Sequence, residues 1–171
     1  MSAELSFFTS IGLSLVAWSV VTSRYVWPRL RLMPGVEALR PLLTLHAFRF
    51  LGLAFLVPGV VSADLPPAFA HAAAYGDIVA ATLALLSVAT LSRGFGVVFV
   101  WIFNVWGTVD LLTAFYRANS SGLSAGQLGA AYFIPTLVVP LLLITHALMF
   151  RLLLQRPSIT VVRERSLVAR A

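Results

Sequence analysis

The chain contains five apolar runs, each about as long as a membrane-spanning helix, joined by short polar connections. The hydrocarbon core of a bilayer is about 30 Å thick, and about 20 helical residues cross it. Of the 171 residues, 60% are hydrophobic and only 11% are charged, whereas soluble domains average about 25% charged residues. A soluble globule of this size cannot hide so much apolar surface. We therefore expect an all-α integral membrane bundle of five helices, at about residues 5–27, 42–62, 76–92, 94–116 and 130–154.

The placement of arginine predicts the orientation of this bundle. Every basic residue is arginine, and the side of the bundle that carries most of them is expected to face the cytoplasm. The opposite side has only Arg117, together with Glu4, Asp64 and Asp77. We expect the N-terminus outside, the C-terminus in the cytoplasm and a bacterial inner membrane as the location. The arginines that lie on the predicted cytoplasmic side are Arg24, Arg29, Arg31, Arg40, Arg93, Arg151, Arg156, Arg163, Arg165 and Arg170.

Four segments are expected to be something other than straight transmembrane helices. Pro58 in the second span, and Pro135 and Pro140 in the fifth, remove backbone donors and are expected to bend or loosen their helices. The stretch "AFAHAAAY" is predicted to form a short interfacial helix in the second loop. Residues 156–171 are predicted to be a basic cytoplasmic tail that is poorly ordered or lies on anionic lipid.

Composition also excludes several classes of site. The chain has no cysteine, so disulfides, thiolate nucleophiles, iron–sulfur clusters and cysteine zinc sites are excluded. No histidine spacing typical of metal sites is present, so no metal site is predicted. The net charge of +6 is compatible with nucleic acid or anionic lipid. Because charge placement matters more than the sum in a membrane protein, we expect the lipid bilayer and not nucleic acid as the partner.

Four polar residues are predicted to share a layer in the cytoplasmic half of the bilayer. Counting about 1.5 Å per residue from the cytoplasmic helix ends, His46, Arg49, Asn104 and His146 all lie about 7 to 15 Å deep. His46 and Arg49 are three residues apart and point to the same side of a helix. Polar side chains inside spans usually face the bundle interior or a cavity, so this layer is the first candidate binding site.

Arg49 has no obvious carboxylate partner by the same depth count. Asp110 is predicted about 24 Å from the inner end of its helix, whereas Arg49 is only about 12 Å deep, so the two are expected not to meet. Three outcomes are open for Arg49: it reaches the cytoplasmic headgroups, it binds backbone carbonyls at a kink, or it binds an anionic ligand. A lipid phosphate, a haem propionate or a substrate carboxylate fits the last of these.

A second polar layer is predicted near the outer face. It comprises Asp77, Asp110, His71 and Tyr116. Asp77 is expected to begin the third helix, where a carboxylate stabilises the helix N-terminus. A carboxylate inside a span must be protonated, paired or hydrated, and Arg117, two turns along the same helix, is the expected partner of Asp110.

These layers suggest three kinds of function, and whether the protein is an enzyme stays undecided. His46 and His146 on facing helices are compatible with a b-type haem, or with a quinone-type redox cofactor bound by His46, Arg49 and Asn104. The outer layer suggests a protein that binds lipid or a hydrophobic small molecule. A structural or accessory subunit of a membrane complex is the third possibility, in which the polar residues meet a protein partner or a second copy of the chain.

Residues 48–96 also resemble a known family. The stretches "RFLGLAFLVPGVV", "LPPAFA" and "GDIVAATLALLSVATLSRGFG" are similar to the DoxX-like group of small bacterial membrane proteins. The resemblance implies that Arg49 and Asp77 match the recurring charges of that group, some members of which are linked to quinone-dependent redox complexes. The chain departs from the group in having five predicted spans instead of four, and Asp77 where glutamate is more usual.

Overall fold

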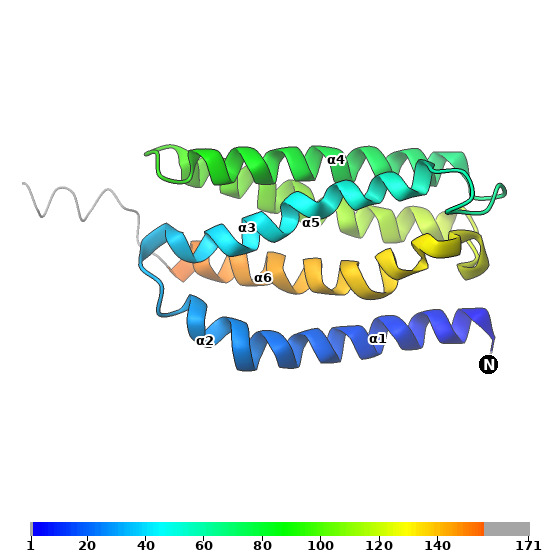
Figure 1. The fold of residues 1–171 in the computed structure, drawn as a ribbon, viewed down its shortest axis with the longest axis horizontal. Helices are drawn as coiled ribbons and strands as arrows, with labels where there is room; N and C mark the ends of the chain where they lie inside the picture. The colour runs from blue at the N-terminus through cyan, green and yellow to red at the C-terminus, as the bar shows by residue number, and fades with distance from the viewer. Residues whose placement is uncertain (1, 156–171) are drawn as a thin grey trace, which may run out of the picture.

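The computed structural model of the protein describes residues 2–155, which contain helices and no β-strand. Five helical stretches are long and apolar enough to cross a membrane, as the sequence predicted. They run back and forth along one axis, so that the N-terminus and the last helix end at opposite ends of the bundle (Figure 1). The basic tail predicted for residues 156–171 lies outside the described residues. The five stretches are Ala3–Leu30, Gly35–Leu56, Pro67–Thr90, Gly96–Ser120 and Ile134–Gln155.

The first and last stretches change their helical type near a proline. The first consists of α1 (Ala3–Val21), a π-helical turn and α2 (Trp27–Leu30). In the last, a π-helical turn that contains Pro135 precedes α6 (Val139–Gln155). Proline cannot donate a backbone hydrogen bond, and a π turn is one way for a helix to absorb the missing bond. The expected loosening at Pro135 is therefore present.

The second stretch is only partly α-helical. It begins with a 3₁₀ turn, continues as α3 (Arg40–His46) and then becomes a 3₁₀ helix, η3 (Ala47–Leu56). The prediction that Pro58 lies inside this helix was wrong, because the helix ends at Leu56 and Val57 has an extended backbone. Proline clashes with an α conformation in the residue before it, which accounts for this end.

The third stretch begins earlier than expected. Helix α4 (Pro67–Thr90) includes "AFAHAAAY", so this segment is not a separate interfacial helix. Pro67 stands in the first turn, where its missing N–H group costs no hydrogen bond. As a consequence, Asp77 lies in the interior of α4. The prediction that Asp77 begins this helix and stabilises its N-terminus was therefore wrong. Helix α5 (Gly96–Ser120) follows after a tight connection.

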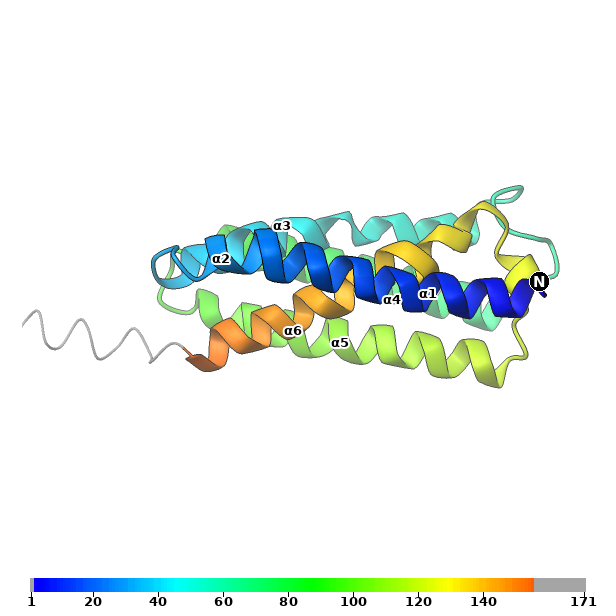
Figure 2. The same cartoon turned by 90° about the horizontal axis from the view of Figure 1, so that it is seen from below.

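Helix α4 forms the centre of the packing and α1 its periphery. Helix α4 contacts α3, η3 and α5, whereas α1 contacts α6 and the π turn before it. All of α1 is described and none of its residues is buried. It lies on the outside of the bundle, at the bottom of Figure 1 and in front in Figure 2. Three polar contacts connect it to the rest of the bundle. Trp18 Nε1 donates to the Leu137 carbonyl at 3.0 Å, the Ser10 and Tyr132 hydroxyls are 3.2 Å apart, and the Ala125 N–H donates to Glu4 Oε1 at 3.2 Å.

The buried apolar residues form two clusters at the two ends of the bundle. One cluster contains Leu43, Ala80, Phe103 and Met149, and the other contains Phe55, Phe69 and further residues near the N-terminal end. On each of the four inner helices, the residues between these clusters include buried polar groups. They are His46 and Arg49, Asp77, Asn104, and Thr145 with His146.

Candidate functional site

The 3₁₀ geometry of η3 sets which residues of the second span face the interior. A 3₁₀ helix has three residues per turn, so side chains three positions apart lie above one another. Every third residue is buried from Leu43 and His46 of α3 through Arg49, Gly52 and Phe55 of η3. This buried row places His46 and Arg49 side by side, with the small Gly52 next in line. The stripe consists of Leu43, His46, Arg49, Gly52 and Phe55.

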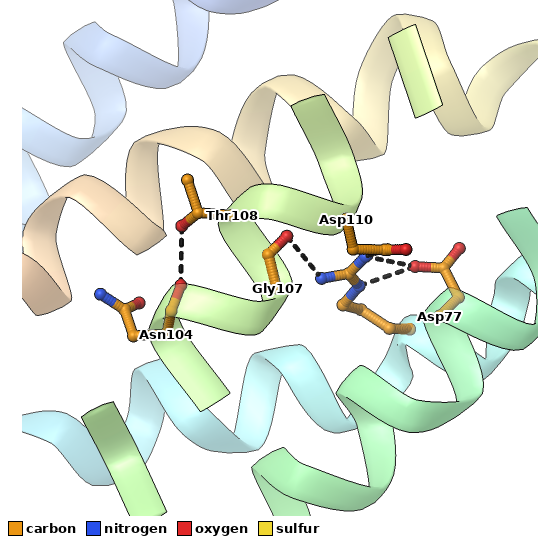
Figure 3. A network of polar contacts seen from close by, with 6 residues as sticks. Asp77, Asn104, Gly107, Thr108 and Asp110 are labelled. Atoms are coloured by element: carbon orange, nitrogen blue, oxygen red, sulfur yellow. Dashed lines mark hydrogen bonds and ion pairs between the residues drawn. The ribbon is translucent and has the colours of Figure 1, made fainter. Parts of the chain in front are cut away.

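Arg49 is bound by two carboxylates and a backbone carbonyl. Its Nε donates to Asp77 Oδ1 at 2.7 Å, and its Nη2 donates to Asp110 Oδ2 at 2.5 Å. Nη2 is also 2.7 Å from Asp77 Oδ1. Nη1 donates to the carbonyl of Gly107 at 3.2 Å. Figure 3 shows Asp77 and Asp110, which come from two helices, on one side of the guanidinium group and the Gly107 carbonyl on the other. The Arg49 side chain is 0% exposed, so it does not reach the headgroups.

The prediction that Arg49 lacks a carboxylate was wrong. Helix α3 begins at Arg40 and α5 at Gly96, each two residues from the expected position. At about 1.5 Å per residue, each of these shifts reduces the expected separation from Asp110 by roughly 3 Å. The long arginine side chain spans the remainder. The predicted partner of Asp110 was also wrong, since the described residues contain no ion pair between Asp110 and Arg117.

Three glycines make room for this charged network. A Cβ atom on Gly52 would overlap the side chain of Asp77, and one on Gly76 would overlap Asp110. At Gly107 a Cβ atom would lie 2.7 Å from His146 Nε2 and 2.9 Å from Arg49 Nη1. The helices therefore approach closely where the charged groups meet, as small residues allow in membrane bundles.

The two predicted core histidines lie in contact with each other. The ring centroids of His46 and His146 are 4.2 Å apart, and both residues are almost fully buried. His46 Nε2 is 2.9 Å from the Thr145 hydroxyl, which itself donates to a backbone carbonyl of its own helix. His46 must therefore be the donor in this pair. His146 Nδ1 is 2.7 Å from Asn104 Oδ1.

These contacts fix which imidazole nitrogens carry protons. Asn104 also uses its amide nitrogen to donate to the His146 carbonyl at 3.4 Å, so its oxygen faces the imidazole and accepts from Nδ1. The remaining nitrogens, His46 Nδ1 and His146 Nε2, are buried and have no hydrogen-bond partner among the described residues. The four residues of the predicted layer, His46, Arg49, Asn104 and His146, thus lie close together and are buried. They form a packed cluster.

A haem does not fit between these histidines. Bis-histidine ligation places the two imidazoles on opposite faces of a flat macrocycle, whereas here the rings touch. Arg49 already binds two protein carboxylates and the Gly107 carbonyl, so its charge is compensated without a propionate. Among the described residues, no group of three or more histidine, aspartate or glutamate side chains is placed to hold a metal ion.

Two members of the predicted outer layer do not join the network. His71 is exposed on α4 beside the ring of Tyr75, and Tyr116 is 72% exposed on α5. The network therefore combines members of both predicted layers: Arg49 from one, and Asp77 and Asp110 from the other. Sequence reasoning missed Thr145 and the Gly107 carbonyl. The spacing of three between the polar residues His46 and Arg49 was the sequence signal for the buried face.

A cavity of about 440 Å³ extends from the carboxylates toward the N-terminal end of the bundle. It lies between α1, α4, α5 and the π turn before α6, and its walls include Phe7, Phe55, Phe69 and Phe115. Asp77 and Asp110 line the end that is deepest along α4 and α5, while Glu4 and Asn119 line the end near the helix termini. The Asp77 and Asp110 side chains are 12% and 17% exposed. The cavity is thus apolar along its length and acidic at its inner end.

One family model matches most of the chain. The chain belongs to the family described as a domain of unknown function, DUF8737, whose model matches residues 6–154. No curated protein and no solved structure matches the chain. The resemblance to the DoxX-like group stays a prediction.

Proposed function

We propose that this member of a family without an assigned function is an integral membrane protein that binds a small apolar or amphiphilic molecule. The binding site is the cavity whose inner end Asp77 and Asp110 line. The observation that carries the proposal is the combination of an elongated apolar chamber with two convergent polar groups at one end. Small-molecule sites in proteins have this composition: mostly hydrophobic and aromatic walls with a few fixed polar groups.

Two further observations support a binding role for the cavity. Its volume of about 440 Å³ falls within the range of about 300 to 1,000 Å³ that is usual for ligand pockets. Its inner end is rigid, because Arg49 fixes both carboxylates through hydrogen bonds from separate helices. Rigid placement of the polar groups reduces the entropy that binding must overcome.

The orientation follows from the arginine distribution. With the N-terminus outside, the cavity lies in the outer half of the bilayer and its mouth, near Glu4 and Asn119, lies at the outer surface. A bacterial inner membrane is the location that this proposal adopts. The molecule therefore reaches Asp77 and Asp110 from the outer side.

A neutral fluorescent probe tests the cavity directly. N-phenyl-1-naphthylamine, which brightens in apolar surroundings, is titrated into the protein in lipid nanodiscs. Wild type is expected to show a saturable signal above the linear signal from lipid. Ala114→Trp, which fills the cavity, is expected to abolish the saturable part. Ala118→Trp is a second filling variant at another position of the lining.

The matched control is Ala89→Trp, the same change at an exposed position of α4 away from the cavity. It is expected to leave the saturable signal unchanged. Identical signals from wild type and both filling variants, with all proteins folded by size-exclusion profile and melting temperature, contradict the proposal.

A further inference from the structure

We infer that the ligand of the cavity carries a positive charge, as an aliphatic ammonium group on an apolar body, and that it exchanges with a proton held by Asp77 and Asp110. The inference rests on the proposed function and adds the chemistry of the ligand. It follows from the charge balance at the inner end of the cavity.

The acidic groups at this end outnumber the basic ones. Asp77 and Asp110 both bind the guanidinium of Arg49, so one positive charge faces two carboxyl groups. Two ionised carboxylates with one arginine leave a net charge of −1 at a largely buried site, where an uncompensated charge is costly. Two carboxyl groups that share one site avoid this cost by holding a proton between them.

The other charged groups around the site do not supply the missing positive charge. Arg117 lies on the far side of Asp110, but its side chain is exposed and the described residues show no ion pair between the two. Glu4, from α1, lines the same cavity and adds negative charge. The His146 ring, from α6, and Arg49 Nη1 both lie next to Gly107, and the described contacts place the proton of this ring on Nδ1, next to Asn104. An additional cation at the cavity side is therefore electrostatically favoured.

Arg49 also directs the carboxylates toward the cavity as acceptors. It occupies Oδ1 of Asp77 and Oδ2 of Asp110 from behind, and both side chains retain some exposure on the cavity side. An ammonium group that binds at the inner end replaces the shared proton. In this exchange the O–H bond of the protonated carboxyl breaks, the proton leaves to water at the mouth, and the ammonium group neutralises the carboxylate that remains.

Three probes of one chain length separate charge from apolar binding. Octylamine, 1-octanol and octanoate share an eight-carbon chain and are cationic, neutral and anionic at pH 7. Binding to the detergent-solubilised protein is measured by isothermal titration calorimetry, and the heats of the cavity-filled Ala114→Trp protein are subtracted. Octylamine is expected to bind at least about tenfold more tightly than the other two. Titration in buffers of different ionisation enthalpy is expected to show release of about one proton per octylamine bound and none for octanol.

The variant Asp110→Asn removes the excess negative charge and keeps the Arg49–Asp77 pair. It is expected to lose the preference for octylamine and the proton release. Asp64→Asn, an equivalent change at an exposed loop acid, is expected to retain both. The comparison of the three probes on wild type does not depend on the folding of Asp110→Asn.

Three results overturn the inference. If octanol or octanoate binds as tightly as octylamine, the site does not select a cation. If octylamine binds without proton release, the ammonium group does not replace a shared proton. If none of the three probes binds, the inference also fails, whereas a saturable N-phenyl-1-naphthylamine signal in the same preparation leaves the proposed function standing.

Discussion

Arg49 is the residue on which the interior of the bundle is organised. Its guanidinium group uses three different nitrogens to bind oxygens from α4 and α5. The planar fork of arginine supplies donors in fixed directions, which a lysine ammonium group cannot reproduce. Removing one partner of a buried ion pair leaves an uncompensated charge and is more costly than removing the whole pair.

Arg49→Lys is therefore expected to lower stability although it preserves the charge. A single ammonium nitrogen cannot reach both carboxylates and the Gly107 carbonyl, so we expect a loss of about 2 kcal/mol or more. The measurement is reversible unfolding in mixed micelles, or melting temperature by intrinsic fluorescence. The control is Arg93→Lys, since Arg93 is exposed in the connection after α4 and its side chain donates to the Ala89 carbonyl. Equal stability of both variants contradicts this account.

A second prediction for a single residue concerns Gly107. A methyl group there would lie 2.6 Å from His146 Cε1 and 2.9 Å from Arg49 Nη1. Gly107→Ala is thus expected to destabilise the protein by about 1 to 3 kcal/mol through overpacking. Gly12→Ala on α1 is the matched change, because nothing lies within 4 Å of its added Cβ atom. It is expected to be neutral or stabilising, since alanine is the better helix former. Unfolding of both variants under the same conditions decides between these outcomes.

At the scale of the element, the 3₁₀ segment η3 determines which side chains of the second span are buried. An α-helix repeats every 3.6 residues and a 3₁₀ helix every 3.0, so only the latter keeps Arg49, Gly52 and Phe55 on one line. The same geometry leaves Phe48, Phe50 and Leu51 exposed. An apolar exposed face of this kind is suited to lipid contact, where the hydrophobic effect does not favour burial.

Burial and apolarity are therefore separate properties in this bundle. Leu43 of α3 is 0% exposed, whereas Leu13 of α1 is 66% exposed. Leu43→Ala is expected to cost about 2 kcal/mol or more because it leaves a cavity between helices. Leu13→Ala is expected to change stability by about 0.5 kcal/mol or less, as surface substitutions usually do. The unfolding midpoints of the purified variants are compared. Comparable losses of stability from both substitutions would contradict this account and indicate that α1 packs against a further surface.

At the scale of the whole molecule, a charged and polar layer separates two apolar clusters. Each inner helix contributes to this layer, and its members hydrogen-bond across helices. Such a layer fixes the helices along the bundle axis, because a shift of one helix separates several polar pairs at once. It also forms the inner end of the cavity, which Asp77 and Asp110 line.

The orientation of the molecule gives a prediction that the absence of cysteine makes simple to test. Single cysteines are placed at Ser121, in the connection after α5, and at Gly94, in the connection before it. With the N-terminus outside, Ser121→Cys is expected to react with a membrane-impermeant maleimide in intact cells, and Gly94→Cys only after permeabilisation. The wild-type chain is the unlabelled control. The reverse pattern inverts the orientation and places the mouth of the cavity on the cytoplasmic side.

The helical class and the five spans could be predicted from the sequence because they depend on local properties. Apolar length, arginine placement and turn residues are each read from a short window of the chain. The four core residues His46, Arg49, Asn104 and His146 were also identifiable, because polar groups inside spans are costly and stand out against their surroundings. Helix ends were less accurate, and the errors of two residues at Arg40 and Gly96 separated Arg49 from Asp110 in the depth count.

The sequence by itself determined an apolar helical chain with a few polar residues at interior positions. Only the tertiary structure decided that Arg49 joins Asp77 and Asp110, that the histidines touch each other, and that the carboxylates face a cavity. The physical reason is that pairing depends on the rotation and height of separate helices. These are set by close approach at Gly52, Gly76 and Gly107 and by the 3₁₀ winding of η3, and neither is fixed by the composition of any one helix.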